Sequence, residues 1–288
     1  MNDTTRWWPW LVAAIAVGLS PLTLAALGAD GDGFTELAAS MLLAAAIVTL
    51  SGVGALLVTR VSDNSIGYLL LAAGLLVASS SVAGTLPDLE LARVLAETLF
   101  IYGIVIAVVI VPLVFPTGAL LSARWRWIVW TLVAGMVALT LSVVLGSESS
   151  IGEGARYALG RSGSSIATDL LEAFNAVTAF VGLGGAVAAT AIRFRSSRGI
   201  ERQQMKWLVA VASVAALTLP PALVVPMPTL ANALILIALT SVALLPVAIG
   251  IAVLRYRLYE IDRLISRTIG WALVTGLLVG AFAVMVLG

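Results

Sequence analysis

The chain has 288 residues, of which 61% are hydrophobic and only 11% are charged. Soluble domains carry roughly 25% charged residues, so this composition excludes an ordinary soluble domain and indicates an integral membrane protein. Cysteine and histidine are both absent, which excludes disulfides, thiolate or histidine metal sites, Ser–His–Asp triads and phosphotransfer through a histidine of this chain. We therefore expect no metal, no cofactor, no nucleic-acid partner and no enzymatic activity within these residues.

Nine apolar segments are each long enough to cross the roughly 30 Å hydrocarbon core, which takes about 20 helical residues. A backbone in lipid must satisfy its own hydrogen bonds, so each segment should be a helix. The predicted fold class is all-α: a polytopic transmembrane helical bundle that forms one integral membrane domain over residues 1–288, with no soluble domain. In chain order the expected helices are 7–27, 37–58, 66–84, 94–115, 127–145, 170–192, 207–225, 230–254 and 269–287.

The loops between these helices alternate in charge. One set holds all but three of the 16 cations: the N-terminal tail and residues 59–65, 116–126, 193–206 and 255–268. Cytoplasmic loops are rich in Lys and Arg, so we expect the N-terminus in the cytoplasm and, after nine crossings of the plasma membrane, the C-terminus outside. All eight tryptophans lie at or near the expected cytoplasmic helix ends, where indole rings favour the headgroup layer.

Several polar residues and prolines fall at one depth, in the outer halves of the expected helices. Glu97 is an acid inside an apolar run, although it lies about 5 Å from the outer helix end at 1.5 Å per residue and could simply snorkel to the interface. The adjacent Pro220 and Pro221 should break the seventh helix and expose polar backbone to a cavity. This common depth motivates the hypothesis of an outward-facing ligand pocket lined by Glu97, Tyr102, Asn175, Thr218, Pro220, Pro221 and Asn232.

The two longest basic loops are candidates for other roles. Residues 193–206 could contact anionic lipid and fix the orientation, and their last residues could begin the next helix early. In Arg255–Arg267 apolar residues recur at helical spacing among four arginines, which predicts an amphipathic segment that lies on the membrane or passes movement to a soluble part. The glycines Gly276 and Gly280 predict close helix packing, within the bundle or in a homodimer.

Four segments on the expected cytoplasmic face carry short motifs. They are Asp63–Leu70 (DNSIGYLL), Phe115–Arg126 (FPTGALLSARWR), Arg198–Trp207 (RGIERQQMKW) and Arg255–Arg263 (RYRLYEIDR). As a set in this order they resemble the N-terminal multi-pass membrane region of actinobacterial sensor histidine kinases. The resemblance covers most of the chain.

The resemblance implies a sensory or input module of two-component-type signalling that is not catalytic in this chain. The residues that it assigns to signal relay are Arg198, Glu201, Arg202, Lys206, Arg255, Arg257, Tyr259, Asp262 and Arg263. In the family two further membrane helices follow the last loop and lead to cytoplasmic kinase domains, whereas this sequence holds one helix there and no nucleotide-binding glycine boxes. We expect either a fragment of a longer protein or a stand-alone relative that acts through a partner.

Two other classes of protein stay open. One is a small membrane transporter or lipid-handling protein, although matched inverted halves and intramembrane charges, which are typical of transporters, are not evident. The other is a structural membrane subunit held by the helices of a partner.

Overall fold

The computed structural model describes residues 7–23, 33–61, 65–86, 90–146, 165–197, 200–224 and 228–254. These residues form helices joined by short connections, and no strand occurs among them. The all-α prediction is therefore confirmed for this part of the chain. The elements are α1 (Trp8–Leu19), α3 (Gly33–Arg60), α4 (Ser65–Gly84), α5 (Glu90–Val105), the π-helix η2 (Ile106–Ile110), α6 (Val111–Val114), the 3-10 turn η3 (Ala123–Trp125), α7 (Arg126–Gly146), α9 (Ser165–Ser196), α10 (Ile200–Val224) and α11 (Pro228–Leu254).

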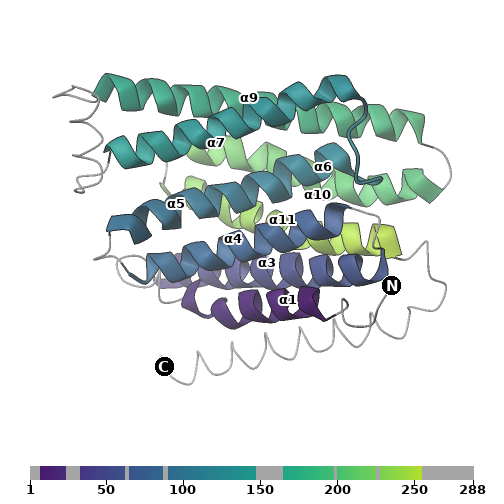
Figure 1. Ribbon diagram of the computed structural model, residues 1–288, viewed down its shortest axis with the longest axis horizontal. Coiled ribbons are helices and arrows are strands. Elements are labelled where there is room, and N and C mark those ends of the chain that lie inside the picture. Colours follow the sequence, from purple (N-terminus) through teal and green to yellow (C-terminus); the bar gives the residue numbers. More distant parts are fainter. Residues whose placement is uncertain are drawn as a thin grey trace.

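The long helices lie side by side, and successive ones run in opposite directions (Figure 1). Helices that follow each other in the chain pack together as α3 with α4, α4 with α5, α7 with α9, and α10 with α11. The last described helix returns to the first part of the chain, because α11 also packs against α3, and α1 covers α3 and α4. The result is one bundle, as expected for a chain whose helices are apolar on most faces.

Six of the described helical stretches are long and apolar enough to cross a membrane: Thr35–Arg60, Ser65–Gly84, Val94–Val114, Ala123–Leu145, Ala167–Ser196 and Thr229–Val253. They coincide with six of the nine expected spans, so the chain is a membrane-embedded helical bundle. The short apolar α1 and the apolar part of α10 occupy two more of the expected positions. The ninth helix and the loop before it lie outside the described residues, and the number nine stays a prediction.

Two details of the helix ends and breaks bear on the sequence-based expectations. The segment 193–206 is largely helical, because α9 runs on to Ser196 and α10 already begins at Ile200; the early helix start is thereby confirmed. The expected break at Pro220 is wrong, since α10 continues through both prolines to Val224. A proline deprives only the carbonyl four residues earlier of its partner, and this helix ends within one turn of the pair.

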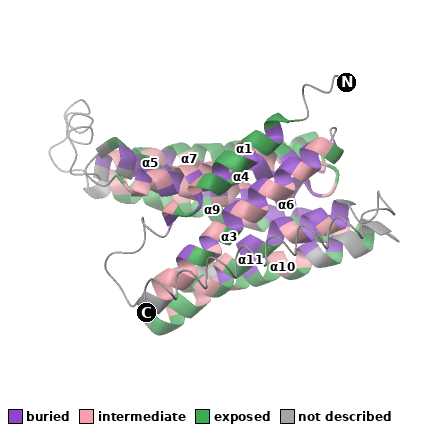
Figure 2. Cartoon of the chain, turned by 90° about the horizontal axis from the view of Figure 1, so that it is seen from below, coloured by how far each residue is buried: buried purple, intermediate pink, exposed green. Residues whose placement is uncertain are grey.

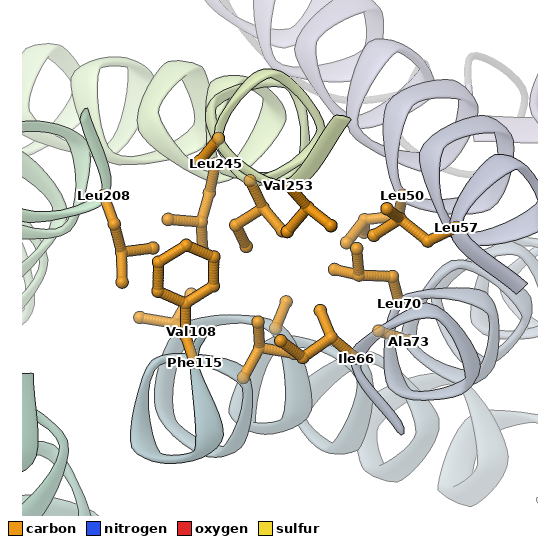
Figure 3. Close-up of a cluster of buried hydrophobic side chains, with 14 of the residues drawn as sticks. Leu50, Leu57, Ile66, Leu70, Ala73, Val108, Phe115, Leu208, Leu245 and Val253 are labelled. Carbon is orange, nitrogen blue, oxygen red and sulfur yellow. The ribbon is translucent and has the colours of Figure 1, made fainter. Parts of the chain in front are cut away.

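The main hydrophobic cluster gathers side chains from α3, α4, the η2–α6 segment, α10 and α11. Figure 3 shows the ring of Phe115 among Leu208, Leu245 and Val253, with Leu70 on the far side of the cluster. On the outer faces of the helices many residues are exposed (Figure 2), and a large share of them are large and apolar. Such a surface is suited to lipid and not to water.

Close approach of α3 and α4 depends on glycines. A Cβ on Gly54 would lie 2.7 Å from the backbone nitrogen of Leu71, and a Cβ on Gly67 would lie 2.8 Å from that of Val58. Backbone atoms cannot move away as a side chain can, so neither position has room for a methyl group. A Cβ on Gly52, in the same helix as Gly54, would meet nothing within 4 Å. Small residues at these crossings are how membrane helices bring their backbones together.

We predict that Gly54→Ala destabilises the bundle by about 1–3 kcal/mol, the usual effect of overpacking a filled contact. Gly52→Ala, on the same helix and with the same change in propensity, should leave stability unchanged or slightly raised. Unfolding of both variants in mixed detergent micelles, followed by loss of helical circular dichroism, measures the difference. Equal stabilities of the two variants would contradict the α3–α4 packing described above.

Candidate functional site: a junction at the basic end of the bundle

One end of the bundle collects the described cations. The end of α3, the start of α4, the α6–α7 connection, the end of α9 and the start of α10 all lie there (Figure 1). The cationic side chains that the structure describes are Arg60, Arg124, Arg126, Arg193, Arg195, Arg202 and Lys206. The carboxylates that it describes lie in the N-terminal parts of helices that start at the other end: Glu36 in α3, Glu97 in α5, and Asp169 and Glu172 in α9. We call the two ends the basic end and the acidic end.

Tryptophans mark the same basic end. Trp127 and Trp130 at the start of α7 are 58% and 68% exposed, and Trp7 and Trp10 are exposed at the start of α1. The ring of Trp8 stacks on Tyr68 with 6.1 Å between centroids, which places the start of α1 beside the start of α4. Exposed indoles next to exposed cations are typical of the boundary between acyl chains and headgroups.

The connection after α6 folds back tightly. Phe115 is fully buried, and Gly118 adopts a φ of 76°, a left-handed conformation that glycine takes without strain. The Gly118 N–H donates to the carbonyl of Val114 at 2.9 Å. This turn ends the helix and leaves the carbonyls of the loop in need of donors from elsewhere.

Two side chains from distant parts of the chain supply those donors. The guanidinium of Arg193, in the last turn of α9, donates to the carbonyl oxygens of Phe115 and Ala119. The hydroxyl of Ser65, the first residue of α4, donates to the carbonyl of Gly118 at 2.6 Å. Arg193 is only 9% exposed. We call this arrangement, made of Ser65, the loop Phe115–Ala119 and Arg193, the junction.

The junction also reaches α10 and α11. Phe115 packs in the same cluster as Met205 and Leu208 of α10 and as Val253 near the end of α11. Next to it, the guanidinium of Arg202 lies over the ring of Phe194, 5.3 Å from its centroid. Through one short loop the structure therefore connects α4, α6, α9, α10 and α11. A shift of any of these helices changes contacts of the same few residues.

The helix that leads into the junction is irregular. Its middle is the π-helix Ile106–Ile110, followed by Pro112 in α6. A π-turn and a proline are the usual causes of helix bending, and π-turns occur often at functional sites. One turn before it, the hydroxyl of Tyr102 bonds to α7, 2.8 Å from the carbonyl oxygen of Met136 and 2.5 Å from Oγ1 of Thr140. The irregular segment thus separates two anchored regions.

The residues expected to line an outer pocket are distributed over two parts of the bundle. Tyr102 and Asn175 both border α7: Tyr102 bonds to Met136, and Asn175 Oδ1 would lie 3.5 Å from a Cβ at Gly135. Glu97 is exposed, near the start of α5.

Thr218 and Asn232 lie on α10 and α11. The hydroxyl of Thr218 donates to the carbonyl of Val214 in its own helix at 2.8 Å, and Asn232 is exposed. For Pro220 and Pro221 the structure describes the backbone alone. Each hydrogen bond formed by the described members of this set goes to a residue outside the set, so the shared pocket stays a prediction.

Of the residues expected in signal relay, the described ones are at the basic end. Arg202 and Lys206 are exposed on the first turns of α10, and the backbone of Glu201 lies in the same helix. Arg198 and the whole segment with Arg255, Arg257, Tyr259, Asp262 and Arg263 lie outside the described residues.

Comparison of the chain with protein-family models, curated proteins and solved structures gave no match. The geometry of the junction therefore carries the functional argument. Three of the four segments that carry the sequence motifs contribute to this one place: Ser65 from the first, Phe115–Ala119 from the second, and Met205 from the third.

Sequence reasoning did not single out Arg193. The residue is the first cation after a long apolar run, which a snorkelling side chain explains equally well. Its function depends on the loop that it contacts, 74 and 78 positions earlier in the chain. A single sequence does not show which distant loop an arginine contacts in the folded chain.

We predict that Arg193→Gln speeds hydrogen exchange at the amides of Phe115 and Gly118 about tenfold or more, because carbonyls that hold the loop lose their charged donor. Arg193→Lys should behave similarly, since one ammonium group does not reproduce the two-pronged guanidinium. Hydrogen–deuterium exchange of the protein in nanodiscs, followed by mass spectrometry, measures the change in exchange rate. Arg195→Gln removes an exposed neighbouring charge and serves as the control, with exchange as in the wild type. Exchange as in the wild type in Arg193→Gln would contradict the role of Arg193 in the junction.

Proposed function

We propose that the chain is a membrane-embedded, non-catalytic input module of a two-component-type signalling protein. A stimulus at the acidic end changes the helix arrangement, and the basic end, which faces the cytoplasm, passes the change to a kinase domain or partner outside these 288 residues. The observation that carries the proposal is the junction, where Arg193 and Ser65 hold one loop between helices from distant parts of the chain. The resemblance of the cytoplasmic motifs to sensor histidine kinase membrane regions supports the same class.

The route of the signal follows the irregular helix formed by α5, η2 and α6. Tyr102 anchors its outer part to α7, the π-helix and Pro112 form its flexible middle, and Phe115 anchors its inner end in the main cluster. A bound ligand shifts a conformational equilibrium only if it contacts the two states differently. Tyr102 belongs to the proposed outer pocket, so a ligand that competes for its hydroxyl would act on this helix directly.

The proposed output site is the start of α10 together with the loop after α11. Arg202 and Lys206 are exposed there, and the end of α11 leads from the cluster around Phe115 into the segment 255–267. Helix shifts of about 1–2 Å are common in signalling transitions. Such a shift of α10 or α11 would move both output regions together.

We predict that Tyr102→Phe changes the conformation of the basic end, although the substitution lies more than two helical turns away from it. The absence of native cysteine allows spin labels at Ala119→Cys and Ala210→Cys, both exposed sites. In nanodiscs, double electron–electron resonance should show a shifted or split distance distribution when Tyr102 loses its hydroxyl, because the anchor of the irregular helix to α7 is gone.

Thr131→Val is the matched control, since its hydroxyl is exposed and bonds within α7 to the carbonyl of Trp127. An unchanged distribution in Tyr102→Phe would contradict coupling between the two ends. Uptake assays in liposomes separate the transporter class: sustained substrate flux by the purified chain would favour that class over an input module.

A further inference from the structure

The exposed face of α10 changes character along its length. Leu217 is 73% exposed, and Ala210 and Ser213 on the same side are also exposed. Continuing toward the basic end, this face holds Lys206 and then Arg202, both exposed. Residues four apart lie above one another on a helix, so the two cations cap one continuous, mostly apolar strip.

Arg202 is held in a fixed direction. Its guanidinium lies over the ring of Phe194, 5.3 Å from the centroid, and Phe194 in turn packs against the main hydrophobic cluster. A guanidinium stacked on an aromatic ring keeps its N–H groups, which lie in the guanidinium plane, free at their outer edge. Less side-chain entropy is then lost when these groups bind an anion.

We infer that Arg202 and Lys206 bind the phosphate group of an acidic glycerophospholipid whose acyl chains lie along the exposed face of α10. Arg offers a planar fork that matches phosphate oxygens, and Lys one turn away adds a second charge. The apolar strip of Ala210 and Leu217 supplies the contact that a free phosphate ion would not use. The exposed indoles of Trp127 and Trp130 set the basic end at the depth of lipid headgroups.

The other cations of the basic end are less suited to this role. Arg193 is buried and its guanidinium is committed to the carbonyls of the junction. Arg124 and Arg126 are exposed but two residues apart at the turn into α7, so they point to different sides of it. This pair provides a matched control of equal charge. The lipid site does not depend on the proposed signalling function.

The test is native mass spectrometry of the full chain, released from micelles that contain equal amounts of phosphatidylglycerol and phosphatidylcholine. The wild type should retain phosphatidylglycerol in preference to phosphatidylcholine. In the double variant Arg202→Gln/Lys206→Gln the ratio of retained phosphatidylglycerol to phosphatidylcholine should fall about tenfold, since each interfacial cation contributes to anionic lipid binding. Arg124→Gln/Arg126→Gln should keep it. Phe194→Leu retains both charges but removes the aromatic ring under the Arg202 guanidinium. It should weaken retention of phosphatidylglycerol several-fold.

Three results would overturn the inference. Equal losses in the two double variants would mean that only the total charge attracts lipid. Equal retention of the two lipids by the wild type would show that the chain has no site selective for the acidic lipid. Displacement of phosphatidylglycerol by millimolar inorganic phosphate would assign the cations to a free phosphate ion instead of a lipid.

Discussion

Arg193 lies at the end of a 30-residue apolar span, and only 9% of the residue is exposed. A buried charge without partners costs many kcal/mol, whereas hydrogen bonds from a charged group to good acceptors contribute about 1.5–3 kcal/mol each. The carbonyls of Phe115 and Ala119 supply two such acceptors, and the tight turn after α6 is what points them toward α9. The charge needs the loop, and the loop needs the charge to satisfy its carbonyls. This mutual dependence holds the end of α9 beside α6.

The remaining structure extends from this contact. Ser65 attaches the start of α4 to the same loop, and Phe115 attaches α10 and α11 through the main cluster. At the acidic end, Tyr102 and Asn175 border α7, while Thr218 and Asn232 belong to the α10–α11 pair. The π-helix Ile106–Ile110 lies between Tyr102 and the junction.

The sequence predicted the class of fold because hydrophobic length and charge alternation are local properties. The six long spans follow from them directly, and the gathering of cations and tryptophans at one end agrees with the positions of Arg60, Arg124 and Trp127 in the bundle. The sequence also drew attention to the segments that begin at Asp63, Phe115 and Arg198. Their meeting at one place was not predicted, because it depends on which helices are neighbours. The continuity of α10 through Pro220 was missed for a related reason: the effect of a proline depends on where the helix ends.

The central claim is that Arg193 and Ser65 hold the same loop and therefore act as one unit. A double-mutant cycle tests it most directly, with unfolding free energies of the wild type, Arg193→Gln, Ser65→Ala and the double variant measured in mixed detergent micelles. The account predicts a coupling energy of about 1 kcal/mol or more, within the range usual for residues that share a partner. Additive effects, with a coupling energy near zero, would contradict it.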